Sequence, residues 1–197
     1  MQRELETALD ALRAIHATHP AQGDFMPFAP DIGPGNAMRT PHPAETAMLA
    51  QSWDDGPLDD LRDAFLGVAP LAQWRLPYAG TLIDPDFMER FGTFCLIGDG
   101  GFWGSSEMAG YVVYMPAGLY YPWHQHPAEE LYVIVAGEAE FHLEGKTPHV
   151  ARAGDAVYHP SNQSHATVTA HSPLLAYVTW RNHFETPPVW SDAGLHA

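Results

Sequence analysis

The segment GLYYPWHQHPAEELYVIVAGEAEF, residues 118–141, is rich in side chains that can bind metals or move protons. His124 and His126 have the same parity, so an extended chain directs both imidazoles from one face. Glu130 and Tyr132 also share a parity, and a turn at the intervening Pro-Ala pair would bring all four side chains into one cavity. This arrangement of nitrogen and oxygen donors is typical of a divalent-metal site. The alternative is an exposed and merely polar His-x-His pair.

The tyrosines of the same segment are candidates for proton transfer. A phenol has an ordinary pKa of ~10 and is a poor base at neutral pH. A nearby divalent cation favours the phenolate, so Tyr132, two residues after Glu130, could remove a proton next to a carboxylate. Tyr120 and Tyr121 offer a second phenol. The alternative for each is an ordinary tyrosine of the strand or the core.

Two gapped motifs resemble the signatures of the cupin superfamily. The first comprises Gly118, His124, His126, Glu130 and Gly137, and the second comprises Gly154, Pro160, Asn162 and His165. Asn162 and Thr169 depart from the glycine and asparagine that usually stand there, which puts loop shape rather than metal binding in question. The resemblance implies a small antiparallel double-stranded β-helix barrel over roughly residues 77–185. It also implies His126, Glu130 and His165 as ligands of one divalent metal ion.

Two further histidines have less certain roles in this pattern. His124 matches the first histidine of the motif, so it is either a fourth ligand or a neighbour of the metal that binds substrate or a proton. His159 precedes Pro160 in the second motif, and a role in the turn is favoured for it over a place in the site.

A closer resemblance joins YYPWHQHPAEELYVIVAGEAEF, the late YVTWRNH and the helical N-terminal third to the cupin-type, or Q-type, dimethylsulfoniopropionate lyases of marine bacteria. The resemblance implies β-elimination to dimethyl sulfide and acrylate, with Zn, Fe(II) or Mn as metal. It implies Tyr132 as general base and Tyr121 as an assisting or covering residue. Tyr121 and Trp180 would face the sulfonium by cation–π attraction, worth roughly 0.5–2 kcal/mol. Trp180 as plain core filler is the alternative.

Other reactions suit the same donor set. A cupin Fe(II) dioxygenase acting on a small thiol or enediol would use similar ligands. A non-catalytic small-molecule-binding cupin with a structural metal is a third possibility, although the N-terminal helices show no recognition-helix pattern.

The remainder of the chain provides the scaffold for these residues. Leu5, Leu9, Leu12 and Ile15 recur at helical spacing, so residues 3–17 are predicted to form an amphipathic helix that ends at Pro20. Residues 21–43 carry five prolines and three glycines and are predicted to be irregular, with further helices at 42–53 and 58–68. From about residue 77 short Val-, Tyr- and Phe-rich runs predict strands.

We therefore expect a mainly β protein with two parts, a helical extension (1–75) packed on a cupin barrel (76–197). The net charge of −15 argues against nucleic acid as a partner, and no apolar run is long enough to span a membrane. No signal peptide is evident, so a cytoplasmic location is expected. The protein is expected to be a monomer or homodimer. Its expected substrate is a small zwitterionic sulfonium carboxylate. Cys95 is predicted to be a buried structural thiol.

Overall fold

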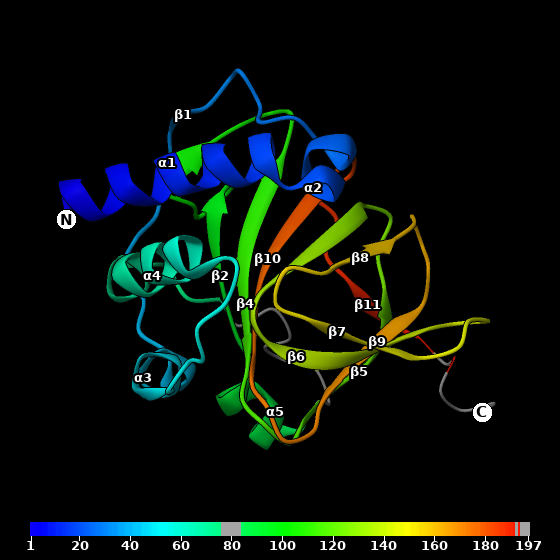
Figure 1. Ribbon diagram of the computed structural model, residues 1–197. Coiled ribbons are helices and arrows are strands. Elements are labelled where there is room, and N and C mark those ends of the chain that lie inside the picture. Colours follow the sequence, from blue (N-terminus) through cyan, green and yellow to red (C-terminus); the bar gives the residue numbers. More distant parts are fainter. Residues whose placement is uncertain (76–83, 192, 194–197) are drawn as a thin grey trace.

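The structure, a computed structural model, describes residues 1–75, 84–191 and 193. Helices from the first third of the chain lie against a β-structure built from the remainder (Figure 1). The helices are α1 (Gln2–Thr18), α2 (Pro20–Phe25), α3 (Pro43–Ala50), α4 (Asp59–Val68), the 3-10 helix η1 (Ala69–Leu71) and α5 (Pro85–Arg90). The prediction of a mainly β protein with an N-terminal helical segment is confirmed.

The predicted helices form where apolar side chains recur every three or four residues. Helix α1 buries Ala8, Leu12 and Ile15 along one face. Helix α4 follows the same rule and buries Leu61 and Phe65. These two helices confirm the predictions for residues 3–17 and 58–68, and α3 ends a little earlier than predicted.

Two short helices correct the sequence predictions. Pro20 does not lead into an irregular segment but opens α2, because its fixed φ suits the first helical position. The ring of His19 caps this helix by accepting a hydrogen bond from the backbone N–H of Gln22. Helix α5 lies in a region predicted to contain only strands, and there Asp84 caps the helix immediately before Pro85.

Eleven strands are present in the described part of the chain. They are β1 (Gly33–Pro34), β2 (Gly92–Ile97), β3 (Trp103–Gly104), β4 (Ala109–Met115), β5 (Leu119–Gln125), β6 (Glu129–Leu143), β7 (His149–Arg152), β8 (Ala156–His159), β9 (His165–Thr169), β10 (Leu174–Arg181) and β11 (Val189–Trp190).

The strands form two sheets that share β6. One sheet has the order β1-β3-β2-β4-β10-β6-β8 and the other has the order β11-β5-β9-β6-β7. All pairs are antiparallel except β2 with β3. Strand β6 pairs with β10 and β8 up to Gly137 and with β7 and β9 beyond it. Gly137 has φ +74°, a conformation that glycine adopts without steric penalty, and this allows the strand to pass between sheets.

The alternation of side chains along β6 and β10 separates two hydrophobic clusters. Leu131 of β6 and Leu175 of β10 belong to the cluster shared with the helices. Tyr132 and Ile134 of β6 belong to the second cluster, inside the barrel, as does Val178 of β10. Residues of even number therefore point into the barrel along β10 and from Glu130 to Ile134 of β6, the face that also carries Trp180. Beyond Gly137, residues of odd number in β6 such as Phe141 point into the barrel.

The other predicted features of the scaffold agree with the structure. The EAEFHLE segment alternates as expected, with Ala139, Phe141 and Leu143 buried. Cys95 is fully buried, and burial raises the pKa of its thiol to about 12, as a structural thiol requires. Within the described residues, no helix is long and apolar enough to cross a bilayer. The predicted boundary at residue 75 adjoins residues 76–83, which lie outside the described part.

Candidate metal centre and pocket

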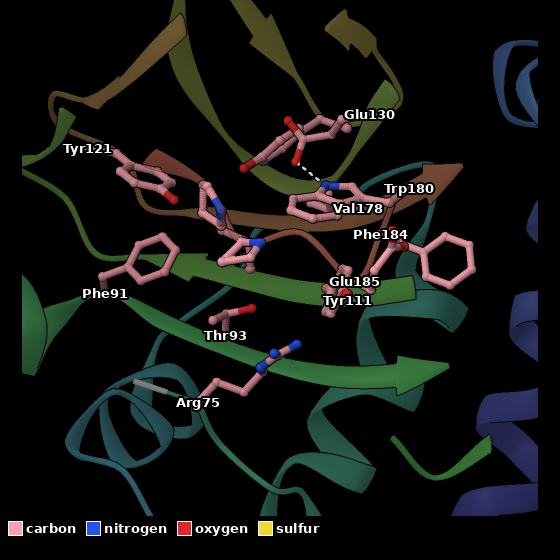
Figure 2. Close-up of a pocket in the computed structure, with 14 residues that line it drawn as sticks. Arg75, Phe91, Thr93, Tyr111, Tyr121, Glu130, Val178, Trp180, Phe184 and Glu185 are labelled. Atoms are coloured by element: carbon pink, nitrogen blue, oxygen red, sulfur yellow. Dashed lines mark hydrogen bonds between the residues drawn. The ribbon is translucent and has the colours of Figure 1, made fainter. Parts of the chain in front are cut away.

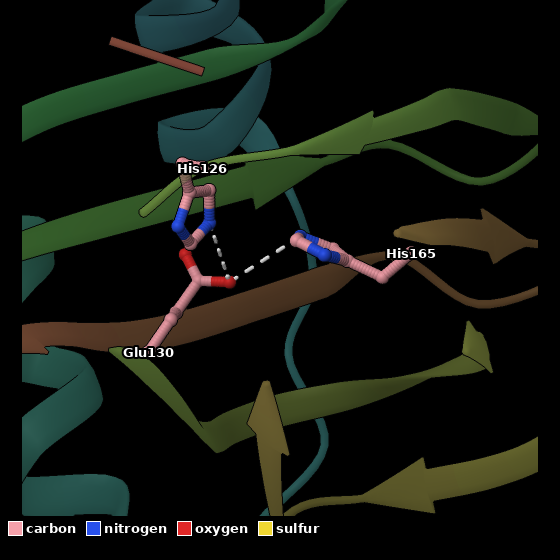
Figure 3. A group of neighbouring side chains, drawn as sticks. All are labelled: His126, Glu130 and His165. Atoms are coloured by element: carbon pink, nitrogen blue, oxygen red, sulfur yellow. Dashed lines mark ion pairs between the residues drawn. The ribbon is translucent and has the colours of Figure 1, made fainter. Parts of the chain in front are cut away.

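Three buried side chains converge inside the barrel. His126, Glu130 and His165 offer ligand atoms that lie within 4.8 Å of one another (Figure 3). The Nε2 atoms of His126 and His165 each lie 3.4 Å from Oε2 of Glu130. All three side chains are at most 3% exposed. The three residues that the cupin resemblance implied as metal ligands are therefore adjacent in space.

The second ring nitrogen of each histidine determines which nitrogen is available to a metal. Nδ1–H of His126 donates to the carbonyl of Ala128 at 2.9 Å, and Nδ1–H of His165 donates to the carbonyl of Gln163 at 2.8 Å. A carbonyl oxygen only accepts, so the proton of each neutral imidazole is on Nδ1. Both Nε2 atoms are buried without a hydrogen-bond partner among the described residues. Such orphaned nitrogens beside a carboxylate fit a divalent metal ion.

The electrostatics of the cluster also suit a cation. Burial acts to raise the pKa of Glu130, but His126 and His159 outweigh it and hold that pKa well below the ordinary value. Burial, reinforced by His159 and His124, keeps the pKa of His165 well below its usual range. Glu130 outweighs burial at His126 and raises the pKa of that imidazole. Glu130 is therefore ionised and His165 is neutral. Because the pKa of His126 is raised, a metal ion that binds this imidazole has to displace a proton more readily held than usual.

His124 lies next to this group of three rather than within it. Its ring stacks on Tyr121 with centroids 4.0 Å apart and lies 4.1 Å from the ring of His165. Burial lowers the pKa of His124 to about 4, so the ring is neutral at neutral pH. Its Nδ1–H donates to the carbonyl of Pro122 at 2.7 Å.

His159 is the residue of the site that the sequence prediction misplaced. It was expected to serve in a turn, whereas it ends β8 directly opposite Glu130 of β6. Nδ1 of His159 lies 2.6 Å from Oε2 of Glu130, and its ring stacks on His165 at 4.0 Å and 13°. The alternation of buried Val157, exposed Tyr158 and buried His159 is the signal that could have placed it inside.

A pocket opens next to the cluster, and half of the residues that line it belong to strands β2, β4, β6 and β10 (Figure 2). It is lined by Arg75, Phe91, Thr93, Tyr111, Val113, Tyr121, Glu130, Tyr132, Val178, Trp180, Phe184, Glu185, Pro187 and Pro188. The predicted residues Tyr121, Tyr132 and Trp180 thus share one cavity with Glu130. Arg75, Thr93 and Tyr111 were not predicted, because nothing near them in the sequence has the pattern of a site.

The three predicted tyrosines differ in position. Tyr132 is 3% exposed, and its ring contacts His159 edge-on at 5.4 Å. Tyr121 is 6% exposed and packs on Phe91 as well as on His124. Tyr120 is 49% exposed and points away, which corrects the suggestion that it is a second phenol of the site.

Trp180 connects the pocket wall to the candidate ligands. Its indole Nε1–H donates to Oε1 of Glu130 at 2.6 Å, and its ring packs on that of His126 at 4.3 Å. Tyr111 contacts the edge of Trp180 at 5.6 Å, and the guanidinium of Arg75 lies 5.5 Å from the ring of Tyr111. Burial raises the pKa of Tyr111 to about 12, with Arg75 acting in the opposite direction, so this phenol stays protonated.

Two sheets that share one long strand around a buried His–Glu site define a cupin-type barrel. The model of the dimethylsulfoniopropionate lyase family matches residues 37–176. Dimethylsulfoniopropionate lyase DddQ of Ruegeria pomeroyi (strain ATCC 700808 / DSM 15171 / DSS-3) is 46% identical over 187 residues, which cover 93% of this chain and 92% of that protein.

Solved structures agree with the sequence match. The crystal structure of DddQ from Ruegeria pomeroyi DSS-3 superimposes with a TM-score of 0.94 and 43% identity, covering 98% of both chains. A chain from the crystal structures of the lyases RdDddP and RnDddQII superimposes with a TM-score of 0.87 and 31% identity, covering 96% of this chain and 98% of that one. The chain belongs to the dimethylsulfoniopropionate lyase family, as its sequence motifs predicted.

Proposed function

We propose that this protein cleaves dimethylsulfoniopropionate to dimethyl sulfide and acrylate by β-elimination. Its family membership supports the reaction. The observation that carries the proposal is the joint exposure of Tyr132, Tyr121, Trp180 and Glu130 to one pocket. A phenol, an aromatic wall and a candidate ligand in one cavity match a substrate that bears both a carboxylate and a sulfonium.

Tyr132 acts as the general base in this proposal. A divalent cation held by His126, Glu130 and His165 would stabilise both the phenolate of Tyr132 and the negative charge that develops on the substrate carboxylate. The Oη atom of Tyr132 takes the proton from the carbon next to the carboxylate. The electrons of that C–H bond form the C=C bond of acrylate, and the C–S bond breaks. Sulfur keeps the electron pair and leaves as neutral dimethyl sulfide, so no acid is needed.

The aromatic side chains bind the cationic end of the substrate. The faces of Tyr121 and Trp180 attract a sulfonium by cation–π interaction, worth roughly 0.5–2 kcal/mol when water is excluded. His124 supports Tyr121 from behind through their stacked rings. We propose that His124 orients this wall, although it remains a candidate fourth ligand.

The test is gas chromatography of the headspace over the metal-loaded protein supplied with dimethylsulfoniopropionate. The variant Tyr132→Phe should form dimethyl sulfide at least about 100-fold more slowly, since general bases contribute factors of that order. Tyr120→Phe is the matched control. Tyr120 is 49% exposed, so the loss of its hydroxyl should leave the rate unchanged. An unchanged rate in Tyr132→Phe would exclude this base. No dimethyl sulfide with Zn, Fe(II) or Mn would exclude the lyase.

The native metal, the oligomeric state and the cellular location of the protein are three further proposals. We propose Zn, Fe(II) or Mn as the native ion, because histidine and carboxylate ligands accept all three. We also propose that the enzyme is a cytoplasmic monomer or homodimer. Elemental analysis of protein purified without chelators, light scattering and cell fractionation test these three proposals separately.

A further inference from the structure

Both oxygens of the Glu130 carboxylate are held by donors from the neighbouring strands. Nε1–H of Trp180 donates to Oε1 at 2.6 Å, and Nδ1–H of His159 donates to Oε2 at 2.6 Å. The three residues face one another directly in the sheet, since Glu130 of β6 pairs with Trp180 of β10 on one side and with His159 of β8 on the other. The register of three strands therefore places a donor on each side of one carboxylate.

The same two donors pack on the two candidate histidine ligands. The indole ring of Trp180 covers His126 with centroids 4.3 Å apart, and the ring of His159 stacks on His165 at 4.0 Å. Each donor thus contacts one carboxylate oxygen and one imidazole. His126, Glu130 and His165 are each held in orientation by packing as well as by hydrogen bonds.

The geometry leaves Oε2 as the oxygen that faces the candidate metal position. Oε2 lies 3.4 Å from Nε2 of both His126 and His165, whereas Oε1 is turned toward Trp180. A carboxylate oxygen has two acceptor positions, so Oε2 can accept from His159 and still bind a cation. Hydrogen bonds to a charged carboxylate are about twice as strong as bonds between neutral groups, which makes rotation of the group unfavourable.

We propose that Trp180 and His159 are positioning residues that hold Glu130 with Oε2 presented as a single-oxygen ligand. The inference rests on the proposed metal site. It assigns to the N–H of Trp180 a role distinct from that of its ring, which remains available to a substrate sulfonium. It also assigns a role to His159, which does not take part in the proposed elimination.

The test is metal affinity, measured on apo-protein by competition for Zn²⁺ with a chromophoric chelator. Trp180→Phe keeps an aromatic ring and removes the N–H, and His159→Leu removes the other donor. Each should bind Zn²⁺ about 10- to 100-fold more weakly, as expected when an outer partner of a ligand is lost. His159→Asn places an amide N–H near the position of Nδ1 and should recover part of the affinity.

The chain offers matched controls for both changes. Nε2 of His142 lies 2.6 Å from Oε1 of Glu140 on the outer face of β6, so His142→Leu removes a histidine–glutamate contact of equal length outside the site. Trp123→Phe removes an indole N–H from β5, and Trp123 does not line the pocket. Both controls should bind Zn²⁺ within about twofold of the wild type, since within the described residues neither side chain has a hydrogen bond or ring contact with His126, Glu130 or His165.

The outcomes separate this inference from the proposed reaction. Wild-type Zn²⁺ affinity in both Trp180→Phe and His159→Leu, in protein with an unchanged circular dichroism spectrum, would overturn it. Weakened Zn²⁺ affinity in the variants, together with a metal-loaded wild type that forms no dimethyl sulfide, would support the positioning role and contradict the lyase. A wild-type protein that binds no divalent ion would overturn the metal site and this inference together.

Discussion

The phenol of Tyr177 donates a hydrogen bond to Nε2 of His16 at 3.0 Å, and this bond joins helix α1 to strand β10 across 161 residues of chain. Nδ1–H of the same imidazole donates to the carbonyl of Met26 at 2.9 Å. Both ring nitrogens are therefore satisfied in the neutral imidazole that carries its proton on Nδ1. At 4% exposure the His16 side chain is buried, and its two hydrogen bonds give it a structural role.

We expect His16 to make the stability of the fold depend on pH. Burial lowers the pKa of His16 to about 4 from an ordinary value of 6.5. Between these values the unfolded chain binds a proton that the folded protein does not, so the contribution to stability falls as the pH falls from 6.5 to 4. The loss should total about 3 kcal/mol. This loss is measured as the change in the free energy of urea unfolding between pH 8 and pH 4, in the wild type and in His16→Leu.

The difference in unfolding free energy between the two proteins is the informative quantity, because burial also lowers the pKa of His124 to about 4. His16→Leu should be the less stable protein at pH 8, and the gap should narrow toward pH 4. Unfolding free energies that fall in parallel would show that His16 does not contribute.

Gly137 should be among the least replaceable residues of the barrel. A Cβ at this position would lie 1.8 Å from the carbonyl oxygen of Pro173, and its φ is +74°. Gly145 has a similar φ of +76° with nothing within 4 Å of its Cβ position, so it isolates the backbone effect. Gly145→Ala should cost about 1–2 kcal/mol. Gly137→Ala should cost clearly more or prevent folding, and equal losses in denaturant unfolding would contradict this.

Metal binding should stabilise the folded protein through Glu130. A ligand at 100 times its dissociation constant stabilises the native state by about 2.7 kcal/mol. Adding Zn²⁺ to apo-protein should therefore raise the Tm of the wild type, and EDTA should reverse the change. Glu130→Gln keeps the shape of the side chain but loses the charge, so its Tm should respond little. Calorimetry measures these Tm values. A Zn²⁺-dependent rise in Tm of equal size in Glu130→Gln would argue against this carboxylate as a ligand.

Arg75 should favour a substrate that bears a carboxylate over analogues that lack one. Among the described residues that line the pocket it alone is an arginine or lysine, in a chain of net charge −15. An exposed charge contact is worth up to about 1 kcal/mol, so Arg75→Gln should raise KM for dimethylsulfoniopropionate about fivefold with little change in kcat. Arg75→Lys should keep most of the effect. An unchanged KM at low salt would show that Arg75 does not meet the carboxylate.

The helical extension and the barrel should not be separable. Phe65 of α4 and Leu12 of α1 lie in the same hydrophobic cluster as Leu131 and Tyr177 of the sheet. The division at residues 75 and 76 remains a prediction, and deleting residues 1–70 should expose this face of the sheet and cause aggregation. A truncated protein that stays monodisperse in light scattering and keeps its β-type circular dichroism would show that the barrel folds alone.

The strand predictions were accurate where apolar and polar residues alternated regularly. The helix predictions were accurate where apolar residues recurred at helical spacing over several turns. They were wrong at α2 and α5, two helices of six residues that begin with a proline. So short a helix has almost no periodicity to detect, and proline starts a helix as readily as it ends one.

The sequence by itself, through its resemblance to the cupin motifs, indicated His126, Glu130 and His165 as candidate ligands. Strand parity placed Tyr132 on the same face as Glu130, because motif spacing and parity are local properties of the chain. Only the tertiary structure decided what surrounds Glu130. His159 and Trp180 lie 29 and 50 residues along the chain from Glu130 and reach its carboxylate through the registers of β8 and β10. Arg75 enters the same pocket from the end of the helical segment. Registers between strands depend on the packing of both sheets around one core, and no short stretch of sequence records them.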